Sequence, residues 1–209
     1  MRHFMKPNIF LIYLFLVSSC GKGQDEIGRN NFNSTYYNSE TFQAEDLRYD
    51  FKIPAAQKHY EEGRRFYEEK EFTKAIESYK SSLQIEKRSG TYNELGMTYR
   101  TIKDSVNSIN TFKEGIRSSA NSWSLYFNLA NTYAAVGDYE NAKKYFEQII
   151  TKTDQKFWKE YSYLNLSAIY YNERDIDKAK EFLEKSKNIQ NNEKFEKLYN
   201  SIKQKVESY

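Results

Sequence analysis

Few side chains in this sequence of 209 residues have reactive chemistry. Cys20 is the only cysteine, so the chain can form neither an internal disulfide nor a cysteine-based zinc site. The sequence contains no glycine-rich phosphate loop, no His-x-x-x-His pair and no Gly-x-Ser-x-Gly elbow. His59 lies among apolar positions, and we interpret it as a packing residue. We therefore expect a protein that is not an enzyme and that binds no metal or cofactor.

Cys20 ends a segment with the three parts of a secretory signal. Positive charges at Arg2 and Lys6 precede the apolar run Ile9–Val17, which is too short to span about 30 Å of hydrocarbon as a helix. The following small residues and cysteine, Val17-Ser18-Ser19-Cys20, resemble the bacterial lipobox, although valine replaces the usual leucine. This resemblance implies cleavage after a signal peptide of residues 1–19 and lipidation of Cys20. The alternative is an ordinary cleaved signal followed by an unmodified thiol.

Residues 20–53 are predicted to form a flexible tether that begins at the lipidated cysteine. The segment is rich in small polar and acidic residues and lacks helical periodicity, so it cannot bury enough apolar surface to order itself. Gly21 differs from the aspartate that retains enteric lipoproteins at the inner membrane, which favours the outer membrane. The tether contains several aromatic residues, which either dock on the folded part or make a merely sticky linker: Tyr36, Tyr37, Phe42, Tyr49 and Phe51.

The stretch Trp123–Ile150 predicts two amphipathic helices joined by a tight turn. Apolar residues from Tyr126 to Tyr133 recur at i, i+3, i+4 and i+7, and therefore share one helical face. Gly137 suits the left-handed position that ends a helix, and Asp138 can cap the helix that follows. Small residues are expected where the two helices cross, and the candidates are Ala130 and Ala142.

The same pattern recurs upstream at offsets of 34 and then 33 residues, and downstream at an offset of 37 residues. We predict four helix pairs and a last helix over Asn192–Glu207, whose apolar face holds Phe195, Leu198, Tyr199, Ile202 and Val206. The predicted pairs are Ala55–Glu69 with Phe72–Glu86, Ser89–Thr101 with Asp104–Arg117, Ser122–Val136 with Tyr139–Thr151, and Phe157–Asn172 with Ile176–Ile189.

A period near 34 residues, with small residues placed four before aromatic ones, resembles the tetratricopeptide repeat. The resemblance implies an all-α fold, a right-handed superhelix of four helix-turn-helix repeats within residues 54–191. The repeats are expected at about 56–88, 89–122, 123–156 and 160–191, followed by a capping helix within 192–209.

In this family the first helix of each repeat lines a concave groove, and the resemblance implies a peptide-binding site there. Asn128 and Asn165 occupy equivalent positions in neighbouring repeats, so they can form an amide ladder along a bound peptide. Asparagine is also common at the positions of Asn128 and Asn131 in this family without contacting a ligand. The candidate groove residues are Tyr60, Arg64, Asn93, Met97, Phe127, Asn128, Asn131, Tyr161, Asn165 and Tyr171.

The charge balance excludes some classes of partner. The chain has 32 basic and 29 acidic side chains, and the loss of Arg2 and Lys6 with the signal lowers the net charge from +3 to +1. Because both signs are mixed throughout, we expect neither nucleic-acid binding nor a polybasic membrane patch.

Taken with the lipobox, the repeats resemble those of lipid-anchored scaffolds in the bacterial cell envelope, which bind a protein or peptide segment. The alternatives are an accessory subunit of an envelope assembly machine, for outer-membrane barrels or pilus secretins, a protein that acts on cell-wall glycan, and a self-assembling structural protein.

Overall fold

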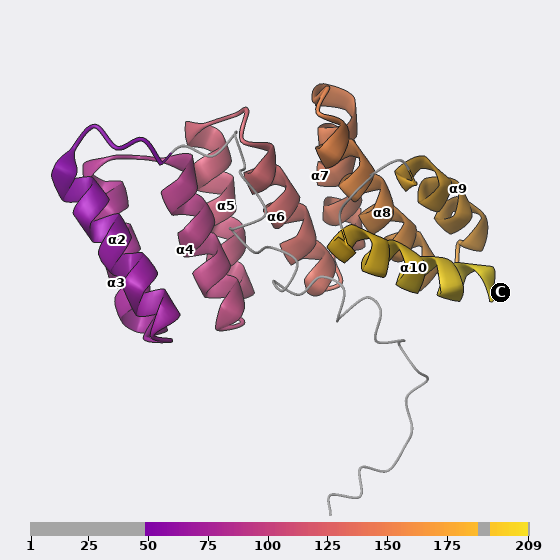
Figure 1. The fold of residues 1–209 in the computed structure, drawn as a ribbon, viewed down its shortest axis with the longest axis horizontal. Coiled ribbons are helices and arrows are strands. Elements are labelled where there is room, and N and C mark those ends of the chain that lie inside the picture. Colours follow the sequence, from indigo (N-terminus) through magenta and orange to yellow (C-terminus); the bar gives the residue numbers. More distant parts are fainter. Residues whose placement is uncertain (1–48, 188–192, 209) are drawn as a thin grey trace, which may run out of the picture.

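The computed structural model describes residues 49–187 and 193–208, which contain nine α-helices and no β-strand. The helices form a row of antiparallel pairs, which runs in Figure 1 from α2 and α3 at one end to α9 and α10 at the other. The helices are α2 (Pro54–Glu68), α3 (Phe72–Ile85), α4 (Ser89–Thr101), α5 (Ser105–Ser118), α6 (Trp123–Ala135), α7 (Tyr139–Lys152), α8 (Lys156–Asn172), α9 (Ile176–Ser186) and α10 (Glu193–Glu207). The all-α superhelix of paired helices is confirmed, with ends that shift by a few residues.

The turn inside each repeat uses one left-handed residue. Gly137 has φ +83°, as predicted, and the equivalent positions in the other repeats hold Lys70, Lys103 and Arg174 with φ between 61° and 67°. These residues follow one another at the same offsets as the repeats themselves. The backbone geometry of the turn is therefore kept in all four repeats, although only one of them supplies glycine.

The residue after the left-handed position caps the next helix in three repeats. The side chains of Asp104, Asp138 and Asp175 each accept a hydrogen bond from the backbone N–H three residues on, at 3.1 to 3.2 Å. In the first repeat this position is Glu71, whose side chain makes no capping bond to α3. The predicted cap at Asp138 is confirmed, and it is a repeated feature of the array.

Small residues let the two helices of a repeat approach closely. Ala130 and Ala142 are both fully buried, and the aromatic rings of Phe112 and Phe146 fill the space beside the crossings. A continuous apolar layer thus runs through the middle repeats, with smaller clusters at either end. Each repeat shares this layer with its neighbours, as expected for a repeat array.

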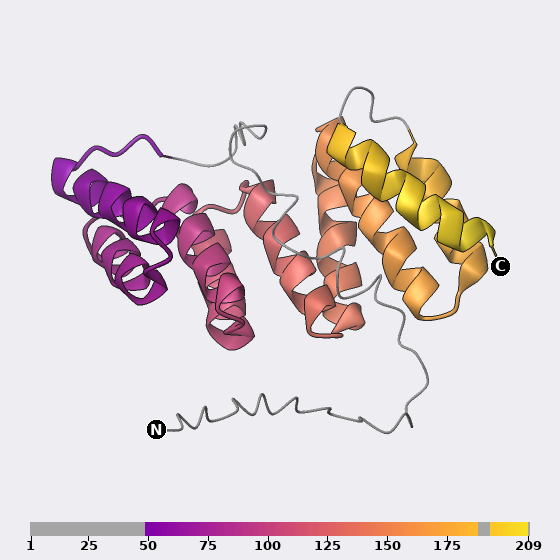
Figure 2. The same cartoon turned by 60° about the horizontal axis from the view of Figure 1, so that its bottom comes forward.

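Helix α10 covers the last repeat. Ile202 and Val206 are buried against Leu164 and Leu183, and both views show α10 lying along α8 and α9 (Figure 2). The capping helix is therefore confirmed, whereas the side chains of Phe195 and Leu198, which the prediction placed on its apolar face, lie outside the described part.

The first helices of neighbouring repeats contact one another more closely than the second helices do. The array therefore curves toward the side formed by α2, α4, α6 and α8, which we call the inner face. The side formed by α3, α5, α7 and α9 is the outer face. Burial follows the same division in the last three repeats, where α4, α6 and α8 each bury ten residues and α5, α7 and α9 each bury three or four. In the first repeat, α2 and α3 each bury three residues.

Candidate functional site

The ten residues predicted to line the inner face all lie on its helices, but most of them are not open to solvent. Arg64 is exposed and Tyr161 is partly buried. The other eight are buried, with at most 8% of their surface accessible: Tyr60, Asn93, Met97, Phe127, Asn128, Asn131, Asn165 and Tyr171. The inner face is therefore a well-packed surface and not an open trough.

Tyr60 packs within the first repeat, although it was predicted to line the peptide-binding groove. Its ring centroid lies 5.6 Å from that of Tyr49, 5.2 Å from that of Phe51 and 6.0 Å from that of Tyr79. Burial raises the pKa of the Tyr60 hydroxyl above its ordinary value. The helical pattern alone could not show this, because the covering residues come from the segment before α2.

Tyr171 also has a packing role that the prediction did not assign to it. It is buried in the cluster that joins α8 and α9 to Ile202 and Val206 of the capping helix. The predicted groove considered only which face of α8 each residue occupies. It did not consider that α10 packs against α8. Tyr171 therefore helps to close the array.

The asparagines form hydrogen bonds within the array itself, and the amide ladder along a bound peptide stays a prediction. Asn128 Nδ2 donates a hydrogen bond of 2.7 Å to Oδ1 of Asn93 in the preceding repeat. Asn165 Nδ2 instead donates to the backbone oxygen of Tyr161, one turn earlier in its own helix, also at 2.7 Å. Asn128 and Asn165 hold equivalent positions, but these bonds do not join them to each other. The link between α4 and α6 therefore runs diagonally across the repeats.

Two amide oxygens on α6 are buried without a donor. Within the described residues, Oδ1 of Asn128 and Oδ1 of Asn131 accept no hydrogen bond. A buried carbonyl group without a donor destabilises a protein by about 1–3 kcal/mol. Both atoms are acceptors suited to N–H groups, which an extended peptide backbone presents along its edge at every second residue.

Aromatic rings stand beside these amides. The Phe127 centroid lies 5.6 Å from Trp158 and 6.2 Å from Tyr161, and Tyr161 lies 4.4 Å from Phe157. Burial raises the pKa of the Tyr161 hydroxyl to about 12, so this group stays protonated and able to donate. Sequence reasoning did not include Trp158, although its position three residues before Tyr161 on the same helix was a usable signal.

Glu94 is a further polar residue of the inner face that the candidate residues did not include. It accepts hydrogen bonds from the hydroxyl of Tyr49 at 3.3 Å and from Asn93 Nδ2 at 3.5 Å. Burial raises the pKa of the Glu94 carboxyl, while Asn93, the Arg64 guanidinium and Tyr49 partly oppose that shift. Glu94 is the equivalent in the second repeat of Asn128 and Asn165.

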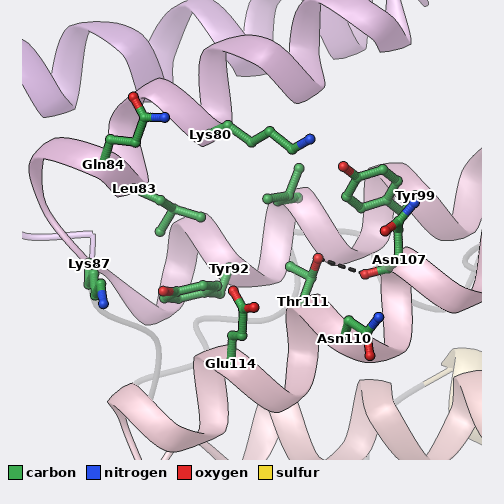
Figure 3. A pocket seen from close by; sticks show the side chains of 11 residues that line it. Lys80, Leu83, Gln84, Lys87, Tyr92, Tyr99, Asn107, Asn110, Thr111 and Glu114 are labelled. Carbon is green, nitrogen blue, oxygen red and sulfur yellow. Dashed lines mark hydrogen bonds between the residues drawn. The ribbon is translucent and has the colours of Figure 1, made fainter.

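A cleft of about 510 Å³ opens on the outer face between the first two repeats (Figure 3). Lys80 and Leu83 of α3 line one side, and Asn107 and Glu114 of α5 line the other, together with Tyr99 of α4. None of the ten predicted residues lines this cleft. Its rim mixes positive, negative and amide groups, so it favours no particular class of ligand.

The described part of the chain shows no sign of a metal centre. Residues 49–187 and 193–208 hold no group of three or more histidine, cysteine, aspartate or glutamate side chains placed to bind a metal ion. None of the helices described there is long and apolar enough to cross a membrane. Cys20 and the residues that resemble a lipobox lie outside the described residues.

Comparison with known proteins agrees with this geometry. The family model of the tetratricopeptide repeat matches residues 124–151 and 160–193, which correspond to α6 with α7 and to α8 with α9. A crystal structure of MamA superimposes with a TM-score of 0.57 at 18% identity, over 75% of this chain and 83% of that chain. The comparison with curated proteins gave no match.

The class of protein follows from three findings. Two repeats match the family model, two more helix pairs follow in the same register, and the fold is shared with a solved structure. The chain is a tetratricopeptide-repeat protein. Repeats of this kind typically form scaffolds for protein–protein interaction, and they bind protein or peptide partners.

Proposed function

We propose that this chain is a lipid-anchored scaffold of the bacterial cell envelope, whose inner face holds an extended segment of a partner protein. The observation that carries the proposal is the pair of buried oxygens on Asn128 and Asn131, which lack donors within the described residues. They lie on the same helix as Phe127, whose ring belongs to an aromatic cluster with α8. Amide acceptors next to aromatic rings suit a peptide that offers backbone N–H groups and apolar side chains.

The anchor part of the proposal rests on the sequence around Cys20. Acyl chains on this residue would hold the array at a membrane surface, because each buried methylene contributes about 0.8 kcal/mol. Anchoring also raises the local concentration of the inner face near membrane partners, so that a modest affinity suffices. The residue after the cysteine, Gly21, supports placement at the outer membrane.

Metabolic labelling with a fatty acid tests the anchor. The chain should incorporate label, and the Cys20→Ala variant should not, while Ser19→Ala should keep the label. Label on the Cys20→Ala variant would show that the lipobox assignment is wrong. Fractionation of the two membranes then tests the placement, since recovery with the inner membrane would contradict the outer-membrane proposal.

A pull-down from detergent-solubilised envelopes tests binding at the inner face. The bait is the acyl-free chain from Gly21 to Tyr209, compared with the variants Asn131→Ala on the inner face and Asn110→Ala on the outer face. Loss of one buried hydrogen bond of about 1–1.5 kcal/mol corresponds to a loss of about 5- to 12-fold in affinity. We expect Asn131→Ala to weaken capture by that factor and Asn110→Ala to leave it unchanged.

Asn110 is a matched control because it is also an asparagine on a repeat helix but is exposed in the outer cleft. Circular dichroism of each bait checks that both variants remain helical. Equal capture by both variants would contradict binding at the inner face. Capture lost only with Asn110→Ala would move the site to the outer cleft.

A further inference from the structure

The rim of the outer cleft favours no class of ligand, but the repeat pattern around the cleft does. We propose that this cleft binds an aromatic side chain of a partner protein, in a segment where an acidic residue lies beside the aromatic one. The cleft lies on the face opposite to the peptide site proposed above. The inference therefore goes beyond that function, and neither site depends on the other.

The third repeat builds a group of three side chains on the outer side of α6. A lysine from the second helix of the preceding repeat lies over a tyrosine of α6, with Lys113 Nζ 5.4 Å from the centroid of Tyr133. A ring from the second helix of the same repeat then stacks on that tyrosine. This ring is Tyr145, whose centroid lies 5.8 Å from that of Tyr133, with 11° between the two planes.

The fourth repeat builds the same group. Lys143 Nζ of α7 lies 5.3 Å from the centroid of Tyr170 on α8, and Phe182 of α9 stacks on Tyr170 at 5.3 Å and 5°. Both stacking rings, Tyr145 and Phe182, are partly buried and pack against the main apolar cluster. In these two repeats the chain's own ring therefore occupies the space beside the tyrosine.

The second repeat lacks the third member of this group. Its lysine and tyrosine are present, since Lys80 Nζ lies 5.7 Å from the centroid of Tyr99. The position of the stacking ring holds Thr111, which precedes Tyr145 by the same 34 residues that separate Tyr99 from Tyr133. Lys80, Tyr99 and Thr111 all line the cleft (Figure 3). The cleft therefore corresponds to the space that a ring fills in the next two repeats.

The lining of the cleft suits an aromatic occupant. Leu83, Tyr92 and Leu95 offer apolar contact, and the hydroxyl of Thr111 already donates to a backbone oxygen of its own helix at 2.7 Å. Because Tyr99 is only 7% exposed, we expect an entering ring to meet it in an offset or edge-to-face geometry, which aromatic pairs prefer. A volume of about 510 Å³ holds a ring together with part of the adjoining chain.

The charges at the cleft indicate the acidic neighbour. In the fourth repeat the lysine over the tyrosine is paired, because Lys143 Nζ donates to the carboxylate of Glu173 at 2.9 Å. Lys80 and Lys87, on the α3 side of the cleft, form no ion pair with any residue of the described part. Glu114 lies on the opposite side. A carboxylate beside the bound ring would therefore give Lys80 the partner that Glu173 gives Lys143.

NMR of methyl groups in the acyl-free chain, from Gly21 to Tyr209, tests the site. The probe is the peptide acetyl-Gly-Asp-Phe-Gly-amide, titrated into the millimolar range. The ring current of the bound phenylalanine should shift the methyl signals of Leu83 and Leu95, and a peptide with alanine in place of phenylalanine should leave them unchanged. A peptide with asparagine in place of aspartate should bind about 2- to 5-fold more weakly, because one exposed ion pair is lost.

Two variants separate the ring contact from the charge contact. Thr111→Phe supplies the missing ring from the chain itself, so it should abolish the shifts and raise the melting temperature. Thr151→Phe, at an exposed position of α7, is its control and should keep the shifts. Lys80→Gln should bind the aspartate and asparagine peptides equally, whereas Lys58→Gln, at an exposed position of α2, should keep the preference for aspartate.

The proposal is overturned if the phenylalanine peptide leaves the Leu83 and Leu95 signals in place, or if the shifts persist in a folded Thr111→Phe chain. Lys80→Gln changes an exposed residue, so it keeps the charge contact testable should Thr111→Phe fail to fold. An unchanged preference for aspartate in that variant would rule out the pairing with Lys80. Free 3-phenylpropionate that bound as tightly as the peptide would show that the ligand is a small aromatic acid and not a protein segment.

Discussion

The hydroxyl of Tyr49 donates a hydrogen bond to the carboxylate of Glu94 at 3.3 Å, across 45 residues of sequence. The Tyr49 ring also lies directly over Gly90, where an added Cβ would meet the ring carbons at 2.2 to 2.3 Å. Gly90 is therefore needed because it lacks a side chain, which lets the segment before α2 lie flat against α4.

A double-mutant cycle measures this contact. Gly90→Ala should destabilise the chain by about 1–2 kcal/mol in urea unfolding, because the new methyl group overpacks the site. In the Tyr49→Ala background the same change should be neutral or slightly stabilising, since alanine is the better helix former. An equal effect of Gly90→Ala in both backgrounds would show that Tyr49 and Gly90 do not interact in solution.

The left-handed turn residues give a second prediction. Gly137→Ala should destabilise by about 1–2 kcal/mol, because a Cβ is unfavourable at positive φ. Lys103→Gly, at the equivalent turn of the second repeat, should instead stabilise by up to about 1 kcal/mol. Lys144→Gly within α7 is the control and should destabilise by about 1 kcal/mol, as glycine does in a helix interior. Thermal unfolding followed by circular dichroism would measure all three, and a destabilising Lys103→Gly would contradict the turn assignment.

A third prediction concerns Glu160 on α8. The residue is buried, its Oε2 lacks a hydrogen-bond partner within the described residues, and Lys156 lies 3.5 Å from its other oxygen. Burial raises the pKa of the Glu160 carboxyl, so the charged form is penalised in the folded state. Glu160→Gln should therefore stabilise the protein by about 1 kcal/mol at pH 7.

The pH dependence of this effect has a definite sign. Below the unfolded-state pKa of about 4.3 the carboxyl is protonated in both states, so the gain from Glu160→Gln should disappear there. The gain from Glu160→Gln should grow as the pH rises from the unfolded-state pKa to the raised folded-state pKa, and it should stay constant above that. Glu181→Gln, at an exposed position on α9, is the control and should show no such rise. A gain that persisted at pH 3 would point to a cause other than the charge.

The aspartate caps supply a fourth prediction. Hydrogen bonds from the side chain and backbone N–H of Asn107 lower the pKa of Asp104. The stabilisation by this cap is then complete above the unfolded-state pKa of about 3.9, and it is lost as the pH falls through the lower folded-state pKa. Asp104→Ala should destabilise by about 1 kcal/mol at pH 7 and have little effect at pH 2.

Glu71 is the matched comparison for that variant, because it occupies the same turn position without a capping bond. Glu71→Ala should change the free energy of unfolding by much less than Asp104→Ala at pH 7. Unfolding by urea at a series of pH values would measure both. Equal losses at pH 7 would mean that the loss at position 104 does not come from its capping bond.

The repeat fold could be predicted because its signals are local. Gly137 and Asp138 mark a turn by their own conformational preferences, and the small residues Ala130 and Ala142 mark the crossing within one repeat. Each of these features depends on residues that are close in sequence, and the structure confirms them. Repetition at a nearly constant offset then indicated the remaining pairs.

The arrangement of the inner face was harder to predict, because it depends on contacts between repeats. The bond from Asn128 to Asn93 joins positions that are 35 residues apart and not equivalent, so a comparison of equivalent positions does not find it. The coverage of Tyr60 by Tyr49 and Phe51 depends on a segment that has no helical period. Residue type indicated that these aromatics could dock, but only their position in space shows on which helices.

The position of Tyr49 also decides how the array responds to mechanical load. A pulling force applied to the N-terminal residues would not act first on the end of α2. It would shear the Tyr49 ring from Gly90 and Glu94, and then draw Phe51 from Tyr60, before it loaded the two N–H groups held by Glu86. These contacts therefore lie, one after another, between the N-terminal residues and α2. The short segment before α2 would thus bear the load before the helices of the repeats do.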